Sequence, residues 1–459
     1  MSKLKKLVKR PGLFFKDAIE RRLQNLKLPP NTRAIASSYR TGKPTAILIG
    51  FSEWKTWMRE ILPGHNVIFM GHSPRPPQAL LRTIPLYCRP EVYVWSYKFP
   101  PMVQDICRDH GIALTYVEDG FLRSVGLGIE KTKPLSLVFD KRAMHFDAQK
   151  QSDLDHILNS TDFLNNSSII GDAHTIAIAI RNGLSKYLRA DSGGSLRDAL
   201  DLRPGERVVL VLGQVEDDLS IRFGAEKFLS ANDLVEIAAA EHPTARILLR
   251  PHPETLVRAK EHYSDPNSVR HLCDIVDERW SLNETLDIAD HVYTITSFSG
   301  FEAALRGKQV DLFGLPFYGG WGFTNDRHNI PMSTKRRQEL SPIQVLAGAL
   351  VLYPRYFHPD TMRQFSPHEA IMVAQSMMTR LAAEVTGTER HPLPVRRFDP
   401  IATLPEVSAS GERISGAGGS HFREDRETLR PEMEFLAQHG QIAAAARFRG
   451  SIAAQAAGK

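Results

Sequence analysis

The sequence has few cysteines and no long apolar run, and both absences exclude classes of protein. Its three cysteines, Cys88, Cys107 and Cys273, lie far apart without CxxC spacing, so neither a disulfide framework nor a zinc site is indicated. No stretch approaches the ~20 consecutive apolar residues of a transmembrane helix. A protein of the reducing cytoplasm fits these absences best, and we expect no metal or other cofactor.

Two further absences concern phosphate and nucleic-acid binding. Neither GxxxxGK[ST] nor GxGxxG occurs, so a nucleoside triphosphatase and a GxGxxG-type dinucleotide site are not supported. The formal net charge is +6, but residues 1–30 alone carry nine Lys or Arg against two acids. Because the rest of the chain is close to neutral, a nucleic-acid partner is not expected.

The basic N-terminal stretch has its own pattern. Leucine, isoleucine, valine and phenylalanine alternate there with the basic residues, as in a helix that lies flat on an anionic bilayer. Charges interrupt the apolar residues throughout, unlike the continuous apolar core of a signal peptide. We expect residues 1–33 to form a basic amphipathic arm that contacts a membrane surface. A helix that packs on the protein's own body, or is simply solvated, is the alternative.

The remaining sequence up to about residue 385 alternates short apolar runs with helical stretches such as 225–242 and 299–308. Solid apolar runs predict parallel strands that are buried on both faces. The predicted strands are TAILIG (45–50), NVIFM (66–70), VYVW (92–95), IALTYV (112–117), RVVLVLG (207–213), ARILLR (245–250), HVYTI (291–295) and VDLFG (310–314).

Alternation of strand and helix indicates an α/β protein with two doubly wound halves. We expect Rossmann-like domains at 34–190 and 191–384, with the boundary near 188–198, facing a central cleft. This is the GT-B-like layout, which plain two-domain Rossmann enzymes share. Residues 385–459 are rich in Pro, Gly and Ser and predict a disordered, low-complexity linker that ends in a short Ala-rich helix.

Four polar clusters follow predicted strands, at the edge where ligands bind in open α/β sheets. In the first, Glu118 and Asp119 end a strand. A carboxylate at the mouth of a cleft can serve as general acid or base. The alternative is structural: one acid caps the following helix or pairs with Arg123.

The second cluster runs from Gln214 to Asp218. These two residues are four apart, so a helical turn that begins here would place them on one face, where the amide can hold the carboxylate. The alternative is a solvated helix start, where the helix dipole favours acids.

The third and fourth clusters predict phosphate contacts. Arg250-Pro251-His252-Pro253 fixes a histidine between two prolines, and a rigid imidazole suits a phosphate or a leaving group. Ser297 and Ser299 precede Gly300 at a helix start, where hydroxyls and backbone N–H groups can bind an anion. Capping alone would explain one serine.

Seven ordered segments, spanning about residues 35–365, resemble the capsule polysaccharide biosynthesis proteins of the KpsC type. They are EDGFLRSVGLG (118–128), PLSLVFDKRAMHFDA (134–148), GQVEDDLSIRFG (213–224), RPHPE (250–254), TSFSGFEAALRGK (296–308), PFYGGWGFTNDR (316–327) and LAGALVLYPRYFHP (346–359). Members of that family are retaining β-Kdo glycosyltransferases that use CMP-Kdo to build the linker between a phospholipid and a Gram-negative capsular polysaccharide. They carry two catalytic modules in tandem, whereas this chain has room for one.

The resemblance implies roles for the clusters. The QxxxD motif, Gln214 to Asp218, would hold the nucleophile Asp218, and Glu118 would take the proton of the acceptor hydroxyl. His252 and the helix start at Ser297 and Ser299 would stabilise the departing CMP, and Arg123 or Arg250 would clamp the Kdo carboxylate. The residues expected to bind the donor are Arg250, Pro253, Ser297, Ser299, Gly300 and Glu302.

The resemblance also implies partners and a location. Domain 34–190 would take the acceptor, a (lyso)phosphatidylglycerol-linked Kdo, and domain 191–384 the CMP-sugar. The enzyme would be peripheral on the inner face of the inner membrane and could meet the capsule export machinery. Two alternatives are a GT-B transferase that uses another CMP-sugar or a UDP-sugar, and a non-catalytic capsule assembly or export component.

Overall fold

The computed structural model describes residues 31–70, 76–122, 124–125, 132–184, 187–188, 194–252, 264–277, 279–331, 336 and 338–386. The basic arm and the C-terminal extension expected from the sequence lie outside these ranges, apart from residues 31–33 and 385–386. None of the described helices is both long enough and apolar enough to span a bilayer. The chain forms two compact units, Met1–Glu118 with Phe139–Met144, and Asp119–Val138 with His145–Lys459.

The division between the units lies upstream of the boundary expected at 188–198. Residues 119–138 and 145–184 belong to the second unit because they pack on its later segments. Ser136–Val138 of β6 (Ser136–Asp140) pair antiparallel with β14 (Pro354–Phe357). Helix α8 (Ser167–Arg181) packs against α16 (Pro367–Thr386). Residues 189–193 of the expected boundary lie outside the described chain.

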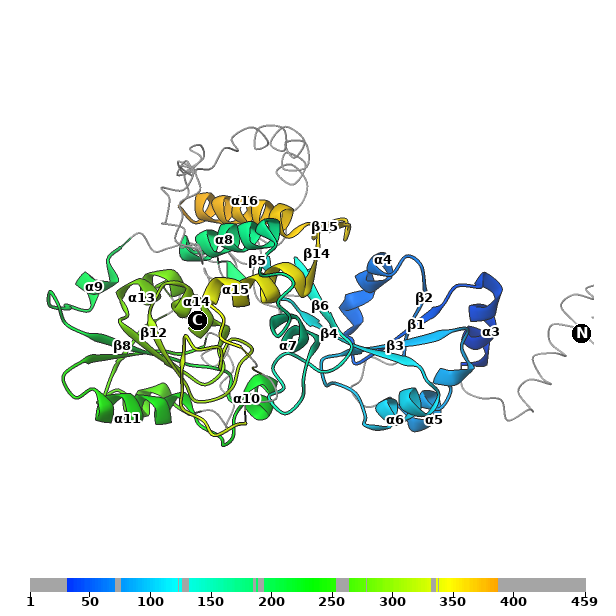
Figure 1. The fold of residues 1–459 in the computed structure, drawn as a ribbon, viewed down its shortest axis with the longest axis horizontal. Coiled ribbons are helices and arrows are strands. Elements are labelled where there is room, and N and C mark those ends of the chain that lie inside the picture. The colour runs from blue at the N-terminus through cyan, green and yellow to red at the C-terminus, as the bar shows by residue number, and fades with distance from the viewer. Residues whose placement is uncertain are drawn as a thin grey trace, which may run out of the picture. The chain divides into compact units, whose positions relative to one another are not determined.

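The first unit contains four of the predicted strands as a parallel sheet. Their order is β4-β3-β1-β2, with bounds β1 (Thr45–Ile49), β2 (Asn66–Phe69), β3 (Pro90–Trp95) and β4 (Ala113–Asp119). All residues of β1 are buried, as a central parallel strand requires. Figure 1 shows helices on both faces of this sheet. The helices of this unit are α3 (Thr32–Thr41), α4 (Met58–Ile61), α5 (Gln78–Leu81), α6 (Met102–Asp109) and the 3₁₀ turns Glu53–Trp57 and Ile84–Leu86.

The second unit contains the other four predicted strands in a parallel sheet of six. In its order, β10-β9-β8-β11-β12-β13, the direction in which successive strands are added reverses between the neighbours β8 and β11, as in a doubly wound fold. The bounds are β8 (Val208–Leu212), β9 (Arg246–Arg250), β10 (Asp274–Ile275), β11 (His291–Thr294), β12 (Gln309–Leu312) and β13 (Asn325–Asp326). Helix α11 (Ala231–Glu241) covers one face, and α13 (Leu282–Ile288) and α14 (Phe298–Leu305) cover the other (Figure 1).

One continuous core lies between this sheet and α11. Val209 and Val211 of β8 and Leu249 of β9 pack there against Leu234 and Ala238 of the helix, and all five are fully buried. Burial of each such large apolar side chain stabilises the fold by about 1.5–3 kcal/mol. Ser230 caps the start of α11 with a capping box to Asp233, so the helix expected from residue 225 begins at Ala231 instead.

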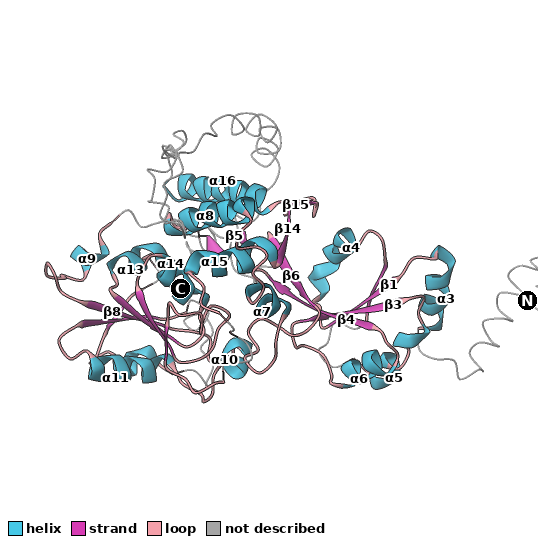
Figure 2. Cartoon of the chain, in the orientation of Figure 1, coloured by secondary structure: helices cyan, strands magenta, loops and turns pink. Residues whose placement is uncertain are grey.

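The remaining elements of the second unit were not predicted as such. They are α7 (Asp153–Leu158), α9 (Leu196–Ala199), α10 (Leu219–Gly224), α15 (Pro342–Leu346), a π-helix at Ala347–Leu352, the 3₁₀ turn Pro266–Val269, the strand pair β5 (Ser124–Val125) and β7 (Tyr187–Leu188), and β15 (Gln364–Phe365) beside β14. Figure 2 shows that loops, rather than regular elements, join α10, α14 and the strands around them.

Candidate active site

The carboxyl ends of β8, β9 and β11 lie side by side at one edge of the second sheet. Gly213, which follows β8, donates its backbone N–H to the carbonyl oxygen of Arg250 at the end of β9, at 2.8 Å. A Cβ at Gly213 would lie 3.0 Å from the Cα of Pro251 and 3.1 Å from the backbone N of His252. The glycine therefore lets the two predicted clusters approach each other closely, and a larger residue would have to displace the backbone at Pro251.

The side chain of Gln214 joins β8 to β11. Its Oε1 accepts from the backbone N–H of Thr296 at 2.8 Å, and its Nε2 donates to Thr296 Oγ1 at 3.1 Å. Thr296 Oγ1 also contacts Ser220 Oγ at 3.1 Å, so the link continues into α10. The second and fourth clusters thus meet through hydrogen bonds. Thr296 and Ser220 were not among the predicted site residues.

Asp218 begins α10 and is exposed. Its Oδ1 accepts from the backbone N–H of Ser220 at 2.7 Å, which makes it the N-cap of a helix that starts at Leu219. Gln214 is therefore not on this helix, and the expected shared helical face of Gln214 and Asp218 is not formed. Gln214 instead positions α10 indirectly, through Thr296 and Ser220.

Two glycines hold the other end of α10. The carbonyl oxygen of Gly224 accepts from the N–H of Leu315 at 2.7 Å. A Cβ at Gly314 would lie 2.6 Å from that same oxygen, and a Cβ at Gly224 would lie 3.1 Å from Thr296 Cγ2. Backbone contact at this distance leaves little freedom to α10, so Asp218 is presented from a fixed support.

Ser297 is the N-cap of α14. Its side chain accepts from the N–H of Ser299 at 3.3 Å, and its carbonyl oxygen accepts from the Tyr318 hydroxyl at 2.5 Å. A Cβ at Gly300 would lie 2.3 Å from that hydroxyl, so Gly300 is buried and makes room for Tyr318. Burial raises the pKa of Tyr318 well above its usual range, which keeps the hydroxyl protonated as a donor.

An aromatic cluster connects the first predicted cluster to the fourth. The ring of Phe121 stacks on Phe298 at a centroid distance of 5.4 Å and packs against Phe317 at 4.5 Å and His145 at 4.8 Å. Phe121 follows Asp119 and Gly120, and Phe298 lies between Ser297 and Ser299. The EDGF, SFSGF and PFYGGW segments are therefore packed together, and Phe121, which makes these contacts, was not among the predicted site residues.

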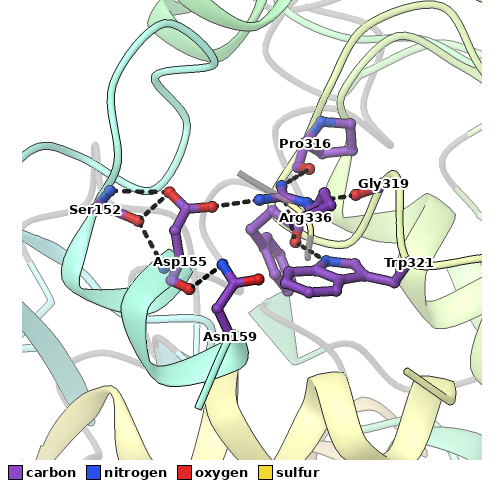
Figure 3. Close-up of polar contacts among 8 residues, drawn as sticks. Ser152, Asp155, Asn159, Pro316, Gly319, Trp321 and Arg336 are labelled. Carbon is purple, nitrogen blue, oxygen red and sulfur yellow. Dashed lines mark hydrogen bonds and ion pairs between the residues drawn. The ribbon is translucent and has the colours of Figure 1, made fainter. Parts of the chain in front are cut away.

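A buried ion pair holds the PFYGGW segment in place (Figure 3). Arg336 pairs with Asp155 of α7, and their side chains are 3% and 5% exposed. Arg336 Nε also donates to the carbonyl oxygen of Gly319 at 2.8 Å, and its guanidinium lies 4.6 Å from the centroid of Trp321. Burial lowers the pKa of Arg336, and Asp155 opposes that effect. Removal of one partner of such a pair costs about 3–5 kcal/mol.

The structure also locates the other predicted residues. Glu118 is the penultimate residue of β4 and belongs to the first unit, whereas Asp119, the last residue of β4, belongs to the second. Arg250 Nη1 donates to Thr285 Oγ1 at 2.9 Å, so Arg250 is tied to α13. His252 is partly exposed beside Gly213.

Glu302 differs from its expected place. It is only 1% exposed, which puts its carboxylate inside the core rather than where a ribose can reach it. Two further predictions, Arg123 and Pro253, lie outside the described residues.

A second polar cluster lies at the amino edge of the same sheet, and we call it the amino-edge network. His291 Nε2 donates to Asp311 Oδ1 at 2.8 Å, and Arg327 Nη1 donates to Asp311 Oδ2 at 3.0 Å. Arg327 Nη2 donates to Glu241 Oε1 at 2.6 Å. The Tyr293 hydroxyl donates to Glu241 Oε2 at 2.6 Å and lies 3.0 Å from His242 Nε2. The network joins α11, β11 and β12 to the segment after β13.

Comparison with known proteins agrees with this arrangement. The family model described as "Capsule polysaccharide biosynthesis protein" matches residues 101–170 and 166–356, which include each cluster described above. The chain belongs to this capsule polysaccharide biosynthesis family. Among the described residues, no group of three or more His, Cys, Asp or Glu side chains is arranged to hold a metal ion.

Two relatives match this chain over different shares of their own lengths. The lipopolysaccharide-processing protein LpsZ of Rhizobium meliloti is 37% identical over 319 residues, which are 68% of this chain and 70% of LpsZ. The capsule polysaccharide modification protein LipA of Neisseria meningitidis serogroup B is 37% identical over 273 residues, 59% of this chain. The chain spans only 38% of LipA.

Two solved structures resemble the chain over most of its described length. Thermosulfurimonas dismutans KpsC, β-Kdo 2,4 transferase, has a TM-score of 0.58 and 27% identity, and the match covers 72% of this chain and 98% of that one. The corresponding β-Kdo 2,7 transferase of KpsC has a TM-score of 0.55 and 27% identity, with 72% and 99% covered. The recognised resemblance to KpsC-type proteins and the two-sheet α/β, GT-B-like fold are thus confirmed.

Proposed function

We propose that the chain is a retaining glycosyltransferase that moves Kdo from CMP-Kdo to a Kdo-bearing (lyso)phosphatidylglycerol during synthesis of a capsule linker. The observation that carries this proposal is the pairing of a family match with a fixed, exposed carboxylate: Asp218 stands at the carboxyl edge of the second sheet on a helix held from both ends. The near-complete coverage of single KpsC transferase modules supports one module that forms one linkage.

Asp218 is the proposed nucleophile. Its Oδ1 is held by the N–H of Ser220, so attack on the anomeric carbon of Kdo would use Oδ2. The bond from the anomeric carbon to the CMP oxygen breaks, and CMP leaves with the electron pair. The acceptor hydroxyl then displaces Asp218, and Glu118 takes its proton. Two inversions at one carbon retain its configuration.

The departing CMP carries a phosphate whose negative charge needs donors. The start of α14 offers backbone N–H groups beside Ser297 and Ser299, and a helix N-terminus favours an anion. His252, next to Gly213 at the neighbouring strand end, would donate to the same phosphate. Each preorganised donor of this kind contributes about 3 kcal/mol to the transition state. Pro253 would keep His252 in this orientation.

The buried residues of the donor motif have positioning roles in this proposal. Gly300 admits the Tyr318 hydroxyl, and Gln214 holds Thr296 at the end of β11. Glu302 supports α14 from the core, which replaces the contact with the donor expected from the sequence. Arg123 or Arg250 would clamp the Kdo carboxylate, and the bond from Arg250 to Thr285 fixes the orientation of that guanidinium.

The proposed acceptor places the enzyme at a membrane. The net positive segment 1–30 would hold the protein on the inner face of the inner membrane, where the glycolipid is made and the capsule export machinery is a further partner.

The test is mass spectrometry of the protein after incubation with CMP-Kdo. We expect a Kdo adduct on the peptide that contains Asp218, which disappears in Asp218→Asn and persists in the neighbouring variant Asp217→Asn. An adduct from CMP-sialic acid but not from CMP-Kdo would assign a different CMP-sugar. Capsule formation that is unaffected by Asp218→Ala would assign a non-catalytic assembly role.

A further inference from the structure

Two segments of the first unit that are far apart in sequence form one surface. The residues of α3 and the loop after it, 32–44, pack on residues 82–89, which precede β3. The Tyr39 hydroxyl donates to the carbonyl oxygen of Leu86 at 3.2 Å, and the N–H of Cys88 donates to Ser38 Oγ at 3.1 Å. Arg89 also donates to the carbonyl oxygen of Gly42. These bonds fix the two segments against each other.

This surface exposes large apolar side chains. Tyr39 is 59% and Leu86 is 43% exposed, and they are two of only four large apolar residues that are exposed among the described residues. The bond from the tyrosine hydroxyl to Leu86 places them side by side. An exposed leucine next to an exposed tyrosine gives an apolar patch with a polar rim, which marks an interaction site more often than a scattered surface residue does.

The charge within these two segments has one sign, and Glu91, which follows directly, lies 3.2 Å from His65. Arg40, Lys43, Arg82 and Arg89 are exposed, and neither 31–44 nor 76–90 contains an Asp or Glu. We call these four cations, together with Tyr39 and Leu86, the basic face. Opposite charges are interspersed on most of an ordinary protein surface, so two contiguous segments without an acid indicate an anionic partner.

We propose that the basic face docks on an anionic phospholipid surface. Cations with an aliphatic and an amphipathic aromatic side chain between them are the composition that binds the headgroup region, where Leu enters the acyl boundary and Tyr stays at headgroup level. A single-stranded nucleic acid is a poorer fit, because its bases need a series of aromatic platforms along a groove. The sequence 1–30, which carries the net positive charge, leads directly into α3, so the basic face continues that charge on the folded body.

The basic face and Glu118 lie at opposite edges of the sheet of the first unit. Residues 32–44 precede β1 and residues 82–89 precede β3, so the face lies at the amino ends of the parallel strands. Glu118 lies at the carboxyl end of β4. β1 has five residues, so the two edges are about 17 Å apart at ~3.3 Å per residue. Docking through this face does not cover Glu118.

The test is co-sedimentation of the full-length protein with phosphatidylethanolamine vesicles that contain phosphatidylglycerol. Arg40→Gln/Arg82→Gln removes two exposed cations whose side chains form no hydrogen bond or ion pair with the described residues. We expect its partition coefficient to fall by about tenfold or more, since each basic residue near an anionic surface contributes a roughly fivefold factor. Leu86→Ser should lower it about threefold through lost apolar contact.

A control variant separates the basic face from total charge. Lys227→Gln/Arg270→Gln removes two exposed cations from the second unit and should stay within about twofold of the parent protein. Equal binding of the two double variants would overturn the proposal. So would a loss of the same size on phosphatidylcholine vesicles, or preferential binding of RNA through the same residues. The assay reads binding and not transfer, so its outcome is independent of the proposed glycosyltransferase reaction.

Discussion

The two edges of the second sheet carry similar residues in different arrangements. At the amino edge, the acids Asp311 and Glu241 are hydrogen-bonded to His291 and Arg327 at 2.6–3.0 Å, and the side chain of Asp311 is 2% exposed. At the carboxyl edge, the strand ends are joined by an amide, a threonine and close-packed glycines, and Asp218 faces solvent. The same residue types close a network at one edge and present a reactive group at the other.

The difference shows why charge alone does not identify a site. The hydrogen bonds of the amino-edge network satisfy its buried charges, so the network contributes to stability. One oxygen of Asp218 accepts a hydrogen bond from one backbone N–H. This bond fixes the position of the carboxylate and leaves it exposed to solvent. Variants at the carboxyl edge should therefore change catalysis, and variants at the amino edge should change stability.

The largest effect is expected from Asp218→Asn. Asparagine caps a helix as well as aspartate, so the folded structure should be kept while the nucleophile is lost. We expect the rate of Kdo transfer to fall by about 10⁴-fold, as it does when other enzymes lose their nucleophile. The thermal midpoint of unfolding should stay close to that of the parent protein. Asp217→Asn is the matched control in the same transfer assay. A rate within tenfold of the parent would remove Asp218 from the mechanism.

Gly314→Ala should lower both the transfer rate and the stability, so it does not separate the two edges of the sheet. Its Cβ would lie 2.6 Å from the carbonyl oxygen of Gly224, a backbone atom, so α10 has to move. A shift of about 1 Å in a catalytic group can cost roughly 10²-fold in rate, and the strain should also lower stability by about 1–3 kcal/mol. Transfer kinetics and urea unfolding measure the two effects. In the control Gly64→Ala the Cβ meets no atom within 4 Å, and it should be nearly silent in both.

Arg327→Met should act on stability alone. It leaves Glu241 and the buried Asp311 without their guanidinium partner, which should lower the free energy of unfolding by about 3 kcal/mol. The exposed pair of Arg279 and Asp277 provides the control, because Arg279→Met should cost less than about 1 kcal/mol. Urea unfolding measures both variants. A large loss in transfer rate per folded molecule would contradict the assignment of this edge to stability.

The smallest effect is the pH dependence of the amino-edge network. Burial, with His291 and Arg207 nearby, lowers the pKa of His242 from its usual 6.5. The folded state therefore binds fewer protons, and stability should begin to fall as the pH drops below about 6.5. His242→Gln should flatten this first part of the profile.

A second loss of stability should follow in acid. The Arg327 hydrogen bond lowers the pKa of Glu241, while burial would raise that of Asp311 but is outweighed by bonds from His291, Asn325 and Arg327. Both carboxylates stabilise the fold above their unfolded pKa values, 4.5 and 3.8, and lose that contribution as the pH falls through their folded values. Thermal unfolding across pH measures both steps, and a profile that rises toward acid would contradict them.

The sequence alone predicts the strands well because burial on both faces leaves a strong local signal. All eight apolar runs form strands, and the order of clusters along the chain places Gly213, Arg250 and Thr296 at one edge. The resemblance predicts the family, which the comparisons confirm. The carboxyl ends of parallel strands lie at the same edge of a sheet, so the grouping of these clusters follows from the topology of the fold.

The parts that the sequence does not predict depend on contacts between distant segments. β6 and β14 are short and pair antiparallel, so the helix–strand alternation gives no signal for them. The partner of Gln214 is Thr296, 82 residues away, rather than Asp218 four residues away. The burial of Glu302 and the need for Gly300 beside Tyr318 likewise arise only once the tertiary structure is formed. The assigned chemistry of Asp218, Glu118 and His252 stays a prediction.

The Arg336–Asp155 pair has a consequence for the order of folding. Its partners are 181 residues apart, so this charge pair can form only after a long loop has closed. Until then the Arg336 guanidinium, which donates to the carbonyl oxygens of Pro316 and Gly319, lacks the carboxylate that neutralises its charge in the core. The packing of residues 316–321 around Arg336 should therefore be completed late, after the sheet is already in place.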